Sequence, residues 1–161
     1  MAADAVILER FIHPQLGFAI DVPLGAAIDV DVPPGIALVV REALEATRSP
    51  FRANITVVVE RLEPGTGLDA YVEGSIEVQA GMLDGFHLLD RAPTEVGGRA
   101  AVRTLGHVVK DGLPVVIEQW RLVDEDRGWA IAASCDVFDF PLVGGTFAAC
   151  AESLLLPDAA R

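Results

Sequence analysis

The segment from Phe86 to Val137 constrains the fold more than any other part of the chain. Its apolar runs are separated by turns too short to contain a helix, and they cover residues 86–96, 99–109, 113–123 and 129–137. Gly97-Gly98 and Asp111-Gly112 are residue pairs that tolerate the positive φ angles of two-residue hairpin turns. Strands joined by such tight turns pair antiparallel, so this segment predicts a four-stranded meander.

Further strands are predicted before the meander from alternating or continuous apolar patterns. They cover Leu16–Val22, Ile28–Val32, Ile36–Val40 and Phe51–Leu62. Both faces of Phe51–Leu62 are largely apolar, so we expect a central strand there. Pro93 is expected to interrupt the first strand of the meander, because proline cannot donate a ladder hydrogen bond.

Two helices are predicted, one in the middle of the chain and one near its end. The first covers Leu68–Ala80, where apolar residues recur at helical spacing at Leu68, Tyr71, Val72 and Ile76. The second covers Val143–Leu155, where the residues on one face are Phe147, Cys150, Ala151 and Leu154. The order of strands, helix, meander and helix predicts an α+β fold with a single antiparallel sheet of six to seven strands flanked by helices. Residues 1–161 are expected to form a single domain. The alternative is a helix-grip (START-like) fold, in which the last helix closes a curved sheet.

The charge balance excludes several classes of partner. Twelve Lys and Arg residues stand against 24 Asp and Glu residues, for a formal net charge of −12, and Lys110 is the only lysine. Nucleic acids and anionic membranes need clustered basic side chains, so neither is expected as a partner. The N-terminal residues do not have the pattern of a secretory signal, and no apolar run is long enough to span a membrane, so a cytoplasmic location is expected.

No arrangement of residues predicts a metal site, a cofactor or a nucleophilic centre. His13, His87 and His107 are spread along the chain and are interpreted as partly exposed histidines of strands or loops. Cys135 and Cys150 are interpreted as buried thiols rather than a disulfide. There is no G-x-S-x-G motif for a nucleophilic serine.

Two further clusters of polar or glycine residues are given structural interpretations. Asp136 and Asp139 flank Phe138, and their carboxylates are expected to stabilise a turn or cap a helix rather than to act as an acid–base pair. The cluster Asp124-Glu125-Asp126 is expected to be a solvated turn. Gly144-Gly145-Thr146 is expected to be a flexible entry to the last helix, because no phosphate-binding motif accompanies it.

Several short motifs resemble the PsbP-like superfamily. They are Gly17-Phe18-Ala19-Ile20-Asp21-Val22-Pro23, Phe51-Arg52-Ala53-Asn54-Ile55-Thr56-Val57, the helix with Leu68 and Tyr71, and the turn Gly97-Gly98-Arg99-Ala100-Ala101. The superfamily includes an extrinsic photosystem II protein, a Ran-binding import factor and the bacterial DcrB and LpqN families. The resemblance implies an accessory or binding role without catalytic residues, in a chain of the bacterial DcrB/LpqN type.

The leading hypothesis is therefore a non-catalytic protein-binding or accessory domain. Its candidate contact residues lie on and beside the last hairpin, and they are Trp120, Asp124, Asp126, Arg127 and Trp129. The alternative for the two tryptophans is that they belong to the core, or that only one of them marks an exposed contact face. A partner protein is expected, and a homodimer or larger homo-oligomer is kept as an alternative. A second hypothesis is a small-molecule binding protein or enzyme, which would need an internal apolar cavity.

Overall fold

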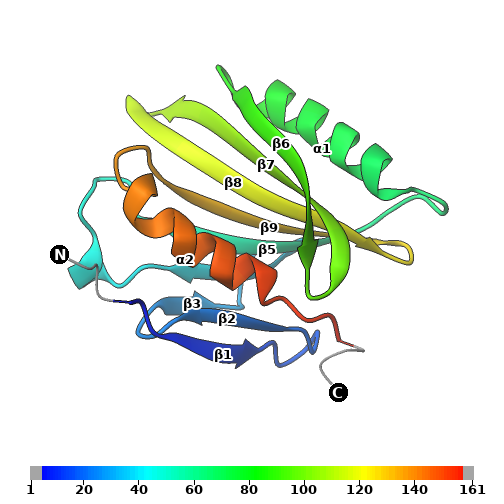
Figure 1. Ribbon diagram of the computed structural model, residues 1–161, viewed down its shortest axis with the longest axis horizontal. Coiled ribbons are helices and arrows are strands. Elements are labelled where there is room, and N and C mark those ends of the chain that lie inside the picture. Colours follow the sequence, from blue (N-terminus) through cyan, green and yellow to red (C-terminus); the bar gives the residue numbers. More distant parts are fainter. Residues whose placement is uncertain (1–4, 158–161) are drawn as a thin grey trace.

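The computed structural model describes residues 5–157 and contains a large antiparallel sheet, a separate strand pair and two α-helices (Figure 1). The large sheet has seven strands, which in spatial order are β3 (Ala27–Asp29), β4 (Ile36–Arg41), β5 (Asn54–Arg61), β9 (Arg127–Asp136), β8 (Leu113–Asp124), β7 (Arg99–Lys110) and β6 (His87–Val96). Every neighbouring pair is antiparallel. The predicted α+β class and strand number are confirmed.

The meander forms as the turn residues predict. Gly97 and Gly98 have φ angles of 56° and 77°, and Asp111 and Gly112 have φ angles of 52° and 79°. The predicted interruption at Pro93 is wrong, because β6 continues through this residue. Since β6 is an edge strand, one side of its backbone has no neighbour, and the missing N–H of proline is tolerated there.

The helices are α1 (Leu68–Met82) and α2 (Phe140–Glu152), and a short 3₁₀ turn, η1, covers Leu44–Ala46. Helix α2 begins and ends earlier than predicted, with Pro141 in its first turn, where a missing N–H costs little. Gly144, Gly145 and Thr146 consequently lie inside α2, and the expectation of a flexible entry is wrong.

The strands near the N-terminus differ most from the prediction. β1 (Leu8–Ile12) was not predicted, because this short segment is mostly exposed and shows no clear alternation. It pairs with β2 (Ala19–Pro23) outside the large sheet. β3 ends at Asp29, before the predicted Val32, because the Asp29 carboxylate accepts a hydrogen bond from the Asp31 N–H at 2.9 Å and turns the chain.

The two helices pack on opposite faces of the large sheet. Trp129, Ile131 and Cys135 of β9 point toward α2, and they join Phe147 and Cys150 of that helix in one apolar core. The alternate residues of β9 point toward α1. In Figure 1, α2 crosses in front of β5 and β9, and the β1–β2 pair lies below it.

The chain beyond α2 returns to the N-terminal strands. Leu155 forms an isolated bridge with Ala19, with N–H to oxygen distances of 2.8 and 3.0 Å. The Ser153 hydroxyl accepts a hydrogen bond from the Asp21 N–H at 2.7 Å. β2 is therefore flanked by β1 on one side and by the C-terminal segment on the other.

None of the helices in residues 5–157 combines the length and the apolar character needed to cross a membrane.

Candidate partner-binding surface

The two tryptophans expected at a contact surface lie in the core. Trp120 is opposite Ile131 and Trp129 is opposite Leu122, so the hairpin register turns both indoles to the α2 side of the sheet. Their exposed fractions are 0% and 1%, and the Trp129 ring packs edge-on against Phe18 with centroids 5.5 Å apart. The prediction that either forms a contact surface is not supported, because neither is accessible.

The other three expected contact residues lie at the tip of the β8–β9 hairpin. Asp124 forms an ion pair with Arg99 at 2.7 Å, and Asp126 forms one with Arg61 at 3.2 Å. Arg127 forms no ion pair with any residue from 5 to 157. The hairpin tip therefore carries two ion-paired carboxylates and an arginine that has no ion pair among residues 5–157.

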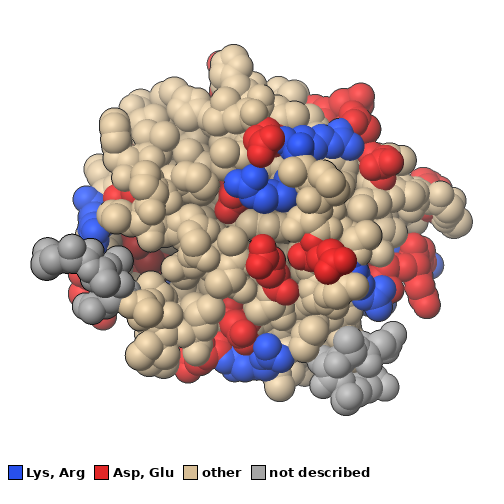
Figure 2. Space-filling view, in the orientation of Figure 1, with Lys and Arg blue, Asp and Glu red and all other residues tan. Residues whose placement is uncertain are grey.

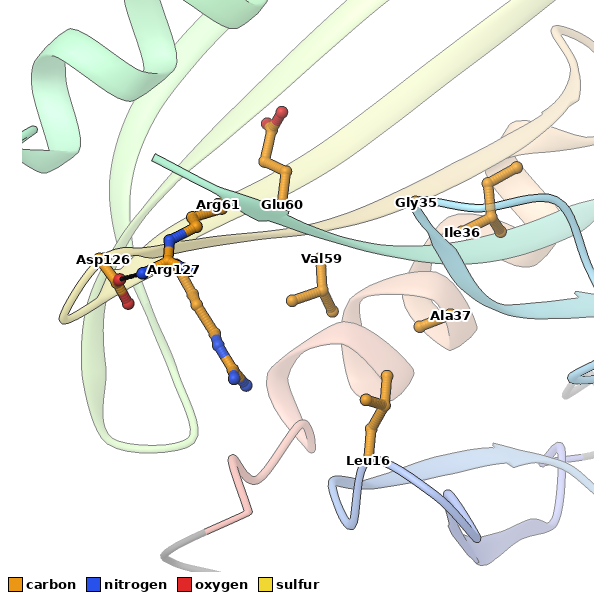
Figure 3. A pocket seen from close by; sticks show the side chains of 9 residues that line it. All are labelled: Leu16, Gly35, Ile36, Ala37, Val59, Glu60, Arg61, Asp126 and Arg127. Atoms are coloured by element: carbon orange, nitrogen blue, oxygen red, sulfur yellow. Dashed lines mark ion pairs between the residues drawn. The ribbon is translucent and has the colours of Figure 1, made fainter. Parts of the chain in front are cut away.

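Arg127 extends into a recess between the hairpin, the β3–β4 turn and the β1–β2 loop (Figure 3). This hairpin recess has a volume of about 400 Å³, and it is lined by Leu16, Gly35, Ile36, Ala37, Val59, Glu60, Arg61, Asp126 and Arg127. Apolar side chains of Leu16 and Val59 face the Arg127 side chain, whereas Glu60 points away toward the α1 side. The recess thus offers a cation beside apolar walls.

A larger groove lies on the other face of the sheet, under α1. Only Tyr71 and Val72 of this helix are buried, and both belong to its first turns. The Tyr71 ring sits on Gly128, where a Cβ atom would lie 2.6 Å from the ring. Farther along the helix, Val78 and Met82 are 59% and 78% exposed.

The space beneath this part of the helix is the α1 groove, with a volume of about 700 Å³. Its outer wall is α1, and its floor is formed by β5, β8 and β9 through Val58, Gln119, Arg121, Ala130 and Ala132. Its lining combines apolar side chains, such as Val58, Val78 and Met82, with polar ones such as Gln79 and Gln119.

A buried arginine lies in the floor of the α1 groove. Arg121 is 3% exposed, and its guanidinium donates hydrogen bonds to the Thr104 hydroxyl at 3.1 Å and to the Gln119 side-chain oxygen at 2.9 Å. It forms no ion pair within residues 5–157. Burial lowers the pKa of Arg121, and burial together with the nearby charge of Glu60 raises the pKa of Tyr71. A buried cation with neutral acceptors is costly for the fold.

The hairpin recess and the α1 groove meet at the end of β5, where Glu60 and Arg61 line both. We call the two together the β5-end surface. The sequence prediction reached Asp126 and Arg127 of this surface but not Arg121. The sequence feature that could have indicated Arg121 is the pattern of β8. On one face of this strand, the apolar residues Val115 and Ile117 are followed by the polar residues Gln119 and Arg121.

Cys135, Cys150 and Asp136 have the structural roles predicted for them, whereas Asp139 does not. Cys135 and Cys150 are free and buried, and burial raises their thiol pKa values to about 12 and about 11. The Asp136 carboxylate accepts hydrogen bonds from the Phe138 N–H at 2.9 Å and the Ser49 hydroxyl at 3.0 Å, which confirms its turn role. Asp139 precedes α2 without capping it through its side chain.

The histidines differ from expectation at one position. His13 is buried, with Nε2 2.9 Å from the Ala37 oxygen, and Nδ1 accepts the Leu16 N–H at 3.0 Å, so the ring holds the β1–β2 loop. His87 and His107 lie opposite each other on β6 and β7. Among residues 5–157, no three His, Cys, Asp or Glu side chains are grouped so that they could hold a metal ion.

Comparison with known proteins gives matches in structure rather than in sequence. No family model and no curated protein sequence matches the chain. The solved structure of cyanobacterial PsbP from Synechocystis matches with a TM-score of 0.67 and 15% identity, over 97% of this chain and 96% of that one. The fold is PsbP-like. The prediction of this fold, rather than the helix-grip alternative, is confirmed.

Other proteins with similar structures have different stated roles. The Ran-binding protein Mog1p of Saccharomyces cerevisiae matches with a TM-score of 0.69 and 11% identity, over 95% of this chain and 97% of that one. LpqN of Mycobacterium tuberculosis, involved in cell envelope biogenesis, matches with a TM-score of 0.61 and 13% identity, over 95% and 92%. The PsbP-like fold is thus found in proteins of several roles, so function must be argued from the site.

Proposed function

We propose that this chain is a non-catalytic accessory protein that binds a segment of a partner protein at the β5-end surface. The observation that carries the proposal is the α1 groove, a recess of about 700 Å³ between the helix and the sheet. Two apolar residues of the helix, Val78 and Met82, are exposed at this groove. Exposed apolar side chains beside a recess are typical of protein interaction sites.

The charges of the surface indicate what the partner would present. Arg127 in the hairpin recess is exposed and has no ion-pair partner within residues 5–157. A partner segment with an acidic side chain next to an apolar one would fill the apolar space and pair with a guanidinium. Arginine is enriched among the residues that dominate binding energy at protein interfaces.

The comparison with Mog1p supports the proposal at the level of fold. That protein is Ran-binding, and its structure matches this chain with a TM-score of 0.69 at 11% identity. The shared fold shows that this architecture is compatible with protein binding, and the particular surface proposed here comes from the residues of this chain.

The test is affinity capture from an extract of the source organism with four purified forms of the protein. Val78→Asp places a charge on the apolar wall, and Arg127→Glu reverses the free cation. Both residues are exposed, so the fold should be retained. Lys110→Glu is the matched control, because Lys110 is an exposed cation at the β7–β8 turn. The proteins that each form retains are quantified by mass spectrometry.

We expect one protein to be retained by the wild type and by Lys110→Glu, and to be reduced by about tenfold or more for both surface variants. Retention that is the same for all four forms would contradict the proposal. Retention of further copies of this chain alone, lost in the two surface variants, would instead favour the homodimer alternative.

A further inference from the structure

A third recess lies at the start of β5, on the α2 side of the sheet and away from the β5-end surface. Its walls come from the β1–β2 pair, the segment around η1 with β4 and β5, and the N-terminal half of α2. It has a volume of about 450 Å³, and we call it the η1 recess. Figure 2, which views the α2 side, shows a largely uncharged surface over this half of α2 with a hollow beside it.

The walls of the η1 recess are predominantly apolar. Val40 and Ile55 come from the sheet, Val143 and Phe147 from α2, and Leu24 from the turn after β2. The apolar character continues to the outside, since Leu24 and Leu142 are each 58% exposed. An apolar recess of this size is in the range that binds small organic molecules.

The charged side chains that line the recess can still form ion pairs with a ligand. Glu42 accepts a hydrogen bond from the Ala53 N–H through Oε1 at 3.2 Å. The Asp139 carboxylate does not cap α2, and neither it nor Arg48 forms an ion pair within residues 5–157. The lining therefore contains two carboxylates and one guanidinium.

Carboxylates outnumber basic side chains in the lining of the η1 recess, where Glu42 and Asp139 stand against Arg48. The charges of Asp139, Asp136 and Glu42 all add to burial in raising the pKa of the Cys135 thiol. The lining therefore favours a positively charged group over an anionic one.

We propose that the η1 recess binds a small cationic amphiphile, a molecule with one amine or guanidinium group on an apolar body. The apolar body lies against Val143 and Phe147, and the cation pairs with Asp139 and Glu42. Burial of apolar surface supplies most of the affinity, and the carboxylates select the sign of the charge. This inference is independent of the proposed function, because the two sites share no lining residue.

The experiment uses two probes with the same alkyl chain and opposite charge, decylamine and decanoate, at neutral pH. Binding to the full chain is measured by isothermal titration calorimetry below the concentration at which either probe aggregates. We expect saturable binding of decylamine at a single site, with an affinity about tenfold or more above that of decanoate.

Three variants assign the binding to this recess. Asp139→Asn should weaken decylamine binding about threefold, because one partly exposed ion pair is lost. Arg48→Gln is the matched control of opposite charge, and it should strengthen decylamine binding. Leu142→Gln removes part of the apolar wall and should weaken binding of both probes. All three residues lie at or near the surface, so the variants should fold.

The proposal is overturned if decanoate binds as tightly as decylamine, if neither probe binds saturably, or if Asp139→Asn and Arg48→Gln change decylamine binding in the same direction. The same samples are also measured by light scattering, because a second copy of this chain is the other candidate occupant of the recess. A dimer that dissociates in Leu142→Gln and does not bind decylamine would show that a second copy covers this face, and that result also overturns the proposal.

Discussion

Helices α1 and α2 cover opposite faces of one sheet, but they are anchored very differently. α2 buries Phe147, Cys150 and Ala151 in the core, so its contact continues along its C-terminal half. α1 buries only Tyr71 and Val72, near its first turn. The difference teaches that a helix can be anchored near its first turn and still expose apolar side chains farther along, as α1 does with Val78 and Met82.

Strand β8 shows the same contrast in its buried charges. Glu118, 2% exposed, points to the α2 side, where Arg103 donates a hydrogen bond to it through Nε at 2.7 Å. Arg121, on the α1 side, finds neutral acceptors in place of a carboxylate. The α2 side therefore neutralises its buried charge within the fold, and the α1 side does not.

The largest expected effect compares the two helices directly. Phe147→Ala should lower the free energy of unfolding by about 3–5 kcal/mol, because it leaves a cavity in the core. Val78→Ala on α1 should change it by about 0.5 kcal/mol or less, because this side chain is exposed. Denaturant titration of both variants measures the difference. Equal losses would show that α1 is packed as firmly as α2.

The second prediction concerns the anchor of α1. Gly128→Ala should displace the Tyr71 ring and lower the free energy of unfolding by about 1–3 kcal/mol. Amide hydrogen exchange should become faster in residues 68–82 and change little in residues 140–152. In the control, Tyr71→Ala combined with Gly128→Ala should cost little more than Tyr71→Ala alone, because the clash is then absent. Full additivity of the two changes would argue against this contact.

The third prediction separates stability from binding at Arg121. Arg121→Met removes a buried cation that has no ion pair, so the free energy of unfolding should change by about 1 kcal/mol or increase. Capture of the partner should be unchanged, because Arg121 is 3% exposed and does not reach the partner. Denaturation and affinity capture on the same preparation provide the two readouts. A stability loss well above about 2 kcal/mol would mean that the fold depends on this guanidinium.

The smallest effect is a pH dependence on the α2 side. Burial raises the pKa of Glu118 above its ordinary value, although Arg103 opposes this. The folded state therefore holds this proton more tightly than the unfolded state, and the contribution of Glu118 to stability falls as pH rises through the folded pKa.

Glu118→Gln removes that titration. As pH rises from about 4.5, the wild type should therefore lose free energy of unfolding relative to Glu118→Gln. Denaturation at several pH values measures it. A shift in favour of the wild type would show that pairing with Arg103 outweighs burial.

The sequence predicted best those parts of the fold that depend on residues close together along the chain. The period-two pattern and the Gly97-Gly98 and Asp111-Gly112 turns are local, and they predicted the meander correctly. β1 was missed because its pairing with β2 is not visible in its own exposed residues. The placement of β5 beside β9 is equally non-local, and only its apolar faces indicated an interior strand.

The candidate site was predicted in part for similar reasons. Asp126 and Arg127 were expected at the hairpin because the turn itself is a local feature. The tryptophans were placed wrongly because their exposure depends on the hairpin register and on what covers that face. Arg121 was missed because its burial depends on the distance between α1 and the sheet, which no single segment determines.

The bridge between Ala19 and Leu155 has a consequence for biosynthesis. Every strand of the large sheet has its neighbours once the ribosome has made residue 136, whereas β2 must wait for residue 155 to obtain its second neighbour. A nascent chain that ends before α2 would hold the large sheet with Trp129 and Ile131 uncovered. Exposed apolar surface of this kind makes a folding chain prone to aggregation, so the synthesis of α2 ends the period in which this face of the sheet is uncovered.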